Sequence, residues 1–177
     1  MEMSVKEKDE ALLNIKGLLL IVVITAIAGI MFQNFYKIGI NQTLSLPHLF
    51  YLIEKNPSEI KRNDIIEFDY YNKNGNGERF FYDNHVPFVK ILAGVPGDEI
   101  MFKGDEFYIN VLATGRVKEL STSGKPLTPN KSKTLGEDEY FLYTPSKDSF
   151  DSRYAYVGYV NREQITGKVK LKWFNQN

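Results

Sequence analysis

The chain has 177 residues, of which 43% are hydrophobic, and its 22 basic and 22 acidic side chains give a formal net charge of zero. This length suits one domain with a substantial core. The charges are interspersed and form no basic stripe, which argues against a nucleic-acid partner. The absence of cysteine excludes a disulfide framework, a thiolate zinc site and a cysteine nucleophile.

An uncharged apolar run occupies residues 17–32. It is slightly shorter than the roughly 20 residues that cross a bilayer, but Lys16 and Tyr36 can extend it to the two interfaces. A buried core helix is disfavoured because the run has no polar face. A cleaved secretory signal is the second alternative, since residues 26–28 resemble a small-residue cleavage site. The apolar run continues beyond that site, so we expect an uncleaved transmembrane anchor over residues 17–36.

The lysines around this run predict its orientation. Lys6, Lys8 and Lys16 precede it, whereas Lys37 alone follows within about fifteen residues, and positive residues favour the cytoplasmic side. The sequence therefore predicts a cytoplasmic tail at 1–16 and an extracytoplasmic domain at 37–177.

The part of the chain beyond Lys37 has mainly strand-like patterning. Short β-branched and aromatic runs alternate with turn signals at 72–77 and 94–98. The expected strands are 64–70, 79–82, 86–93, 99–102, 106–111, 139–143 and 167–173. Residues 112–134, rich in Gly, Ser, Thr, Pro and Lys, are expected to form a long mobile loop. We expect a mainly β domain tethered by one N-terminal transmembrane helix.

Histidine chemistry is poorly supported. The two histidines, His48 and His85, have no spacing that pairs either with a nucleophile and an orienting acid. They form no HExxH-like arrangement, so a zinc site is not expected either.

A serine and a lysine offer another kind of site. Ser45 follows the apolar run closely and lies two residues before Pro47. Lys90 lies in an apolar strand, where Phe88 and Leu92 share its face, and burial among such groups lowers a lysine pKa. These observations alone favour a simpler interpretation, in which Lys90 is an edge-strand lysine whose amine reaches water.

Three separated segments carry a family resemblance. They are TLSLP at 43–47, FVKILAGVPGD at 88–98 and SFDSRY at 149–154. In this order they resemble the boxes of the type I signal peptidases, and more closely those of the conjugative-transfer subgroup. The strands at 64–66, 136–143 and 167–169 are also similar to family strands, so the resemblance extends over residues 17–173.

This resemblance implies a serine–lysine peptidase. Ser45 would be the nucleophile and Lys90 its general base. The backbone N–H of Ser45 and the hydroxyl of Thr43 would stabilise the oxyanion. Ser149 resembles the family serine that holds the lysine amine.

Asp151 and Arg153 are expected to form a supporting ion pair behind the site. Two positions depart from the family pattern: Leu49 replaces a glycine common in the conjugative subgroup, and residues 155–158 lengthen the last box. Both departures bear on the shape of the substrate cleft and remove no reacting group.

The resemblance further implies a bacterial inner-membrane enzyme, held in the lipid bilayer by a single pass, with a periplasmic catalytic domain and no cofactor or metal. Its substrate would be an extended peptide segment of an exported preprotein, such as a prepilin. The alternatives are a non-catalytic pilus or secretion assembly component that keeps the fold, and a self-cleaving serine–lysine repressor. The repressor is disfavoured because the chain has an anchor where such proteins carry a DNA-binding helix-turn-helix. The sequence leaves open whether the product is released by water or by an amine.

Overall fold

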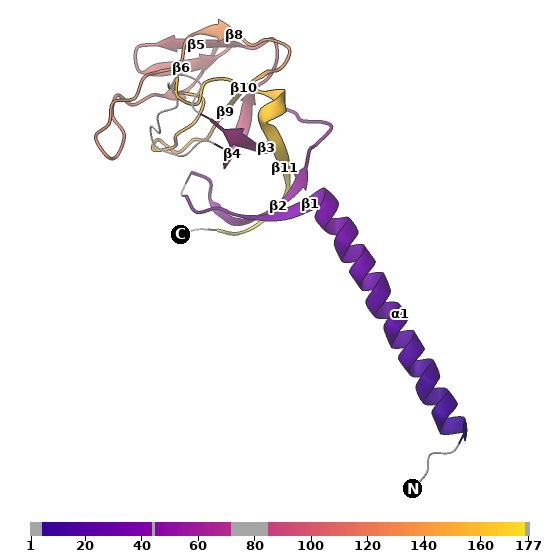
Figure 1. The fold of residues 1–177 in the computed structure, drawn as a ribbon. Helices are drawn as coiled ribbons and strands as arrows, with labels where there is room; N and C mark the ends of the chain where they lie inside the picture. The colour runs from indigo at the N-terminus through magenta and orange to yellow at the C-terminus, as the bar shows by residue number, and fades with distance from the viewer. Residues whose placement is uncertain (1–4, 44, 72–84, 176–177) are drawn as a thin grey trace. The chain divides into compact units, whose positions relative to one another are not determined.

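The computed structural model describes residues 5–43, 45–71 and 85–175 (Figure 1). The chain divides into two compact units, Met1–Tyr36 and Lys37–Asn177, which are described separately.

The first unit is one helix, α1 (Val5–Phe35). It begins earlier than the predicted anchor because residues 5–16 include the strong helix formers Lys, Glu, Ala and Leu. Within it, Leu12–Phe35 is long and apolar enough to cross a membrane. The Thr25 hydroxyl donates to the carbonyl oxygens of Ile21 (2.8 Å) and Val22 (3.0 Å), so the helix itself satisfies this polar group. The helix ends one residue before the predicted anchor does, because Tyr36 opens the first strand.

The second unit contains a larger sheet of seven strands in the order β1-β2-β11-β3-β4-β9-β10. The neighbouring pairs from β2 to β10 are antiparallel. A 3₁₀ turn, η1 (Arg162–Gln164), precedes the last strand. The strands are β1 (Tyr36–Ile40), β2 (His48–Lys55), β3 (Ile65–Tyr70), β4 (Val86–Gly94), β9 (Glu139–Tyr143), β10 (Val160–Asn161) and β11 (Ile165–Asn175).

A smaller antiparallel sheet has the order β7-β6-β5-β8. Its strands are β5 (Glu99–Lys103), β6 (Glu106–Ile109), β7 (Leu112–Arg116) and β8 (Lys133–Thr134). The prediction of one long loop over 112–134 was therefore wrong at both ends. β7 pairs with β6 and β8 with β5, so backbone hydrogen bonds order short segments whose polar composition resembles a loop.

β3 and β4 alternate between two faces of the larger sheet, as strand geometry requires. On one face, residues of β3 and β4 form a buried cluster with residues of β9, β10, β11 and the turn before β10: Ile66, Phe68, Tyr70, Leu92, Tyr140, Leu142, Val157, Val160 and Ile165. On the other face a second cluster forms around Leu46, Tyr51 and Ile53, against which Ile65, Val89 and Ile91 pack. A third cluster joins β5 and β6 to Phe141 of β9, so the small sheet packs on the large one.

The mainly β architecture with one apolar N-terminal helix is as predicted, and the strands predicted at 64–70, 86–93, 99–102, 139–143 and 167–173 are present. The strand predicted at 106–111 ends at Ile109, because Asn110, with a φ of 57°, begins a turn into β7. The predicted turn at 72–77 and strand at 79–82 lie outside the described residues.

Candidate active site

Lys90 lies on β4 with its side chain buried among apolar groups. The register places it opposite Ile66 of β3, and Phe88 and Leu92 share its face of the sheet. Its exposed fraction is only 6%. This burial lowers the pKa of Lys90 from 10.5 to about 8, while Asp151 raises the pKa and Arg153 lowers it. A substantial fraction of the amine is therefore neutral in mildly alkaline solution.

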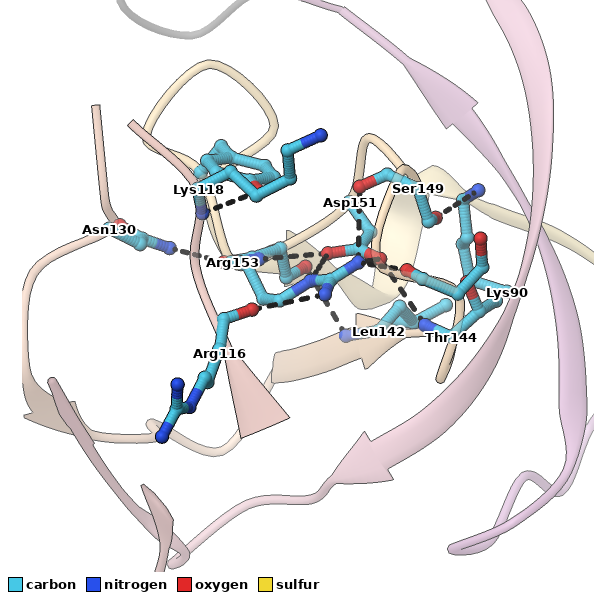
Figure 2. A network of polar contacts seen from close by, with 12 residues as sticks. Lys90, Arg116, Lys118, Asn130, Leu142, Thr144, Ser149, Asp151 and Arg153 are labelled. Atoms are coloured by element: carbon cyan, nitrogen blue, oxygen red, sulfur yellow. Dashed lines mark hydrogen bonds and ion pairs between the residues drawn. The ribbon is translucent and has the colours of Figure 1, made fainter. Parts of the chain in front are cut away.

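Among the described residues, the Lys90 amine donates one hydrogen bond. Nζ donates to the hydroxyl of Ser149 over 2.9 Å, and both groups are buried (Figure 2). The amine also lies 5.6 Å from the centre of the Phe88 ring, where the ring face favours the ammonium form. The expected contact between Lys90 and Ser149 is thus present. It fixes the direction of a side chain that has four rotatable bonds.

Asp151 and Arg153 form a buried ion pair in the network of Figure 2, at 2.8 Å from Nε to Oδ1 and 2.9 Å from Nη2 to Oδ2. Nη2 of Arg153 also donates to the carbonyl oxygens of Ser146 (2.8 Å) and Ser149 (3.1 Å). Nη1 donates to the carbonyl oxygen of Arg116 on β7, at 3.2 Å. The expected pair is present, and its guanidinium organises the backbone that presents the Ser149 hydroxyl to Lys90.

Ser45 lies in the loop between β1 and β2 and is partly buried. Its Oγ lies 2.9 Å from Oγ1 of Thr43, within hydrogen-bond distance. Asn41 accepts hydrogen bonds from the backbone N–H (3.2 Å) and the hydroxyl (3.1 Å) of Thr43, which forms an Asx turn. The loop that carries Ser45 therefore has its own side-chain framework.

Ser45 and Lys90 line one cavity of about 630 Å³. Among hydrogen bonds between described residues, Ser45 contacts Thr43 and Lys90 contacts Ser149, and none joins Ser45 directly to Lys90. The cavity walls come from β1 and the loop after it, from β2 and β3, from residues 86–90 of β4 and from the 146–150 loop. β9 pairs with β4 only from Ile91 onward, so within the described chain the 86–90 edge facing away from β3 has no strand partner.

Two features of this site were absent from the sequence-based prediction. Asn41 organises the loop that carries Ser45, and an Asn four residues before the serine is a recognisable Asx-turn signal. Lys37 and the buried Glu67 form an ion pair of 2.5 Å that lines the same cavity. No sequence signal identifies that pair, because β1 and β3 are far apart in the chain.

Comparison with known proteins identifies the family to which this chain belongs. Residues 12–174 match the family described as signal peptidase, peptidase S26. The chain belongs to this family. Membership supports a signal peptidase I-like function, that of a serine endopeptidase.

Individual relatives agree with the family. Signal peptidase I of Bacillus licheniformis is 27% identical over 190 residues, which cover 99% of this chain and 95% of the relative. Signal peptidase I of Bacillus amyloliquefaciens is 30% identical over 68% of this chain and 62% of its own length. A crystal structure of a signal peptidase I from Enterococcus faecalis V583 is similar with a TM-score of 0.38 and 22% identity, over 63% of this chain and 97% of that one.

Proposed function

We propose that this protein is a membrane-bound signal peptidase that cleaves exported preproteins with a Ser45–Lys90 dyad. The observation that carries the proposal is the buried Lys90 amine, which has a lowered pKa and lines the same cavity as Ser45. A neutral amine can take a proton from a serine hydroxyl at a pH near its own pKa. A scaffold protein has no physical need for such a destabilising group.

In the proposed reaction, neutral Lys90 removes the Ser45 proton as Oγ attacks the substrate carbonyl. The C–N bond then breaks, the leaving amine takes that proton from the Lys90 ammonium, and an acyl-enzyme on Ser45 remains. The backbone N–H of Ser45 and the Thr43 hydroxyl stabilise the oxyanion. Lys90 next activates the water that releases the acyl group. Ser149 holds the amine in place throughout, supported from behind by the Asp151–Arg153 pair.

The substrate in this proposal is an extended segment of a signal or leader peptide. The 86–90 edge of β4 lines the cavity, and its backbone groups can pair with an added strand. Substrate side chains would then point alternately to the two faces of the sheet. The resemblance of the Ser45, Lys90 and Ser149 segments to the conjugative subgroup supports the narrower proposal that a prepilin of a conjugative system is among the substrates.

The proposed setting is the bacterial inner membrane. α1 is long and apolar enough for a single span, and the lysines that precede the apolar run favour an extracytoplasmic 37–177 domain. Signal sequences emerge on that side during export, so a peptidase domain there meets its substrate.

Mass spectrometry of a preprotein co-expressed with this protein tests the proposal. A secreted preprotein and a prepilin are each expressed with the wild type, with Ser45→Ala and with the control Ser123→Ala, which changes an exposed serine. We expect a shortened N-terminus with the wild type and the control, and the full precursor with Ser45→Ala. Processing by Ser45→Ala would contradict the proposal. If the wild type also fails on both precursors, the result favours the non-catalytic assembly role.

A further inference from the structure

Asn41, which the proposed reaction leaves unused, lies at the centre of the loop that carries Ser45. Its Oδ1 accepts from the backbone N–H and the hydroxyl of Thr43, at 3.2 and 3.1 Å. Its Nδ2 donates to the carbonyl oxygens of Leu46 (3.0 Å) and His48 (3.1 Å). One side chain therefore ties together residues on both sides of Ser45.

These partners determine which end of the Asn41 amide is oxygen. The carbonyl oxygens of Leu46 and His48 can only accept, so the atom that faces them must be the NH₂ group. The backbone N–H of Thr43 can only donate, so the atom that faces it must be the oxygen. A flipped amide would place like groups against each other on both sides.

The amide orientation in turn assigns the hydroxyl protons of Thr43 and Ser45. Oγ1 of Thr43 lies 3.1 Å from the Asn41 oxygen and 2.9 Å from Oγ of Ser45, but the Thr43 hydroxyl has only one proton. The Asn41 oxygen cannot donate, so the Thr43 proton points to Asn41. The Ser45 proton then points to Thr43.

We infer that Asn41 is a positioning residue of the active site, which holds the nucleophile loop and makes the Thr43 hydroxyl the acceptor of the Ser45 proton in the resting enzyme. The inference rests on the proposed function of Ser45. It has two consequences. The Ser45 hydroxyl must rotate before it can pass its proton to Lys90. The Thr43 hydroxyl donates to an oxyanion only when it leaves Asn41, so both hydroxyls must rotate during the reaction.

A double-mutant cycle between Asn41 and Thr43 in the full-length protein tests this role, with cleavage of a preprotein as the assay. Asn41→Leu removes the amide at similar volume, and we expect kcat to fall about 10- to 100-fold with little change in KM. The pH midpoint of the reaction should stay near 8, because Asn41 is not among the groups that shift the pKa of Lys90.

Measuring Asn41→Leu in proteins that also carry a change at Thr43 shows whether Asn41 acts through the Thr43 hydroxyl or only supports the loop. In Thr43→Val, which lacks the hydroxyl, Asn41→Leu should lower kcat by less than in the wild type, because only the bonds of Asn41 to the Thr43 N–H and to the carbonyl oxygens of Leu46 and His48 remain to be lost. In the matched background Thr43→Ser, which keeps a hydroxyl, Asn41→Leu should have its full effect. Equal losses in all three backgrounds would overturn the inference, and so would a shift of the pH midpoint.

Two controls separate an effect on catalysis from misfolding and from failure of the proposed function. Thermal melting of each variant sets an assay temperature at which all are folded, and Asn41→Ala replaces Asn41→Leu if the leucine is not accommodated. Ser45→Ala is assayed in parallel. Residual cleavage by Ser45→Ala would contradict the proposed function itself, whereas an inactive Ser45→Ala with equal losses in the cycle would contradict the role of Asn41 alone.

Discussion

The Lys90 side chain lies opposite Ile66 and between Phe88 and Leu92, where an ammonium has lost most of its hydration. Ser149 gives it one close acceptor at 2.9 Å, and Asp151 is the nearby charge that opposes the desolvation. Neither compensates fully, which is why the pKa falls to about 8. Burial that lowers a lysine pKa makes the amine available as a base near neutral pH and costs stability.

The pH dependence of cleavage follows from this pKa. The protonated amine cannot act as a base, so kcat/KM should fall about tenfold per pH unit below about 8 and level off above it. This fall in kcat/KM below about pH 8 should be absent from a reference reaction whose rate does not depend on Lys90, such as hydrolysis of the same peptide by an unrelated peptidase. A flat profile between pH 6 and 9, with chemistry rate-limiting, would remove Lys90 from the base role.

The same shift predicts the effect of Lys90→Met on stability. The folded state binds the Lys90 proton more weakly than the unfolded state, so the penalty is complete below pH 8 and fades between pH 8 and 10.5. The variant should therefore gain about 1 to 3 kcal/mol in the free energy of unfolding at pH 7, and less at pH 10. Denaturant unfolding at the two pH values measures this difference. An equal change in the free energy of unfolding at both pH values would show that burial of the charged amine carries no penalty.

At the scale of elements, β4 connects the two parts of the core through Gly94. An added Cβ there would lie 2.8 Å from Cβ of Phe141 on β9, and near Leu135 and Ile100. Those atoms belong to the cluster that joins the small sheet to the large one. β4 thus needs a glycine after its last large side chains if the two sheets are to pack together.

Gly94→Ala should consequently lower the free energy of unfolding by about 1 to 3 kcal/mol through overpacking. Gly39→Ala is the matched control, because its nearest atom, 2.7 Å away, is Cδ1 at the flexible end of Ile53, which can turn aside. The loss in Gly39→Ala should be smaller. Denaturant melts of both variants give the comparison, and a Gly94→Ala protein as stable as the wild type would contradict the packing described for β4.

Sequence patterning predicted those strands in which β-branched and aromatic residues gather between turn residues, such as β3 and β4. It missed β2 because a continuous apolar run does not distinguish a strand from another buried segment. It missed β7 because Thr114 and Gly115 in a short edge strand resemble a loop, and the pairing with β6 is a tertiary contact.

For the site, the order of the three boxes was enough to predict the Lys90–Ser149 and Asp151–Arg153 contacts. It could not predict the hydrogen bonds of Asn41, because these depend on how the loop closes on the carbonyl oxygens of Leu46 and His48. Local chemistry in a resembling segment is therefore predictable, whereas support that comes from loop closure is not.

For the whole molecule, the orientation of α1 decides whether the site can meet exported peptides. Protease added to intact spheroplasts should digest the 37–177 domain and spare the N-terminal tail, since Lys6, Lys8 and Lys16 favour the cytoplasmic side. A cytoplasmic marker protein checks that the membrane is intact. Protection of the entire chain would reverse the topology, and a mature N-terminus at Gly29 would show that the anchor is cleaved.

The central claim, that Ser45 and Lys90 act as one catalytic unit, is tested most directly by the cleavage rates of Ser45→Ala, Lys90→Ala and the double variant. Lys103→Ala, which changes an exposed lysine, serves as the control. Each single change should abolish cleavage, and the double variant should be no slower than either single variant. When two residues act as one unit, removing the first already removes the contribution of the second. Substantial activity in Lys90→Ala, or single losses that multiply in the double variant, would contradict the account.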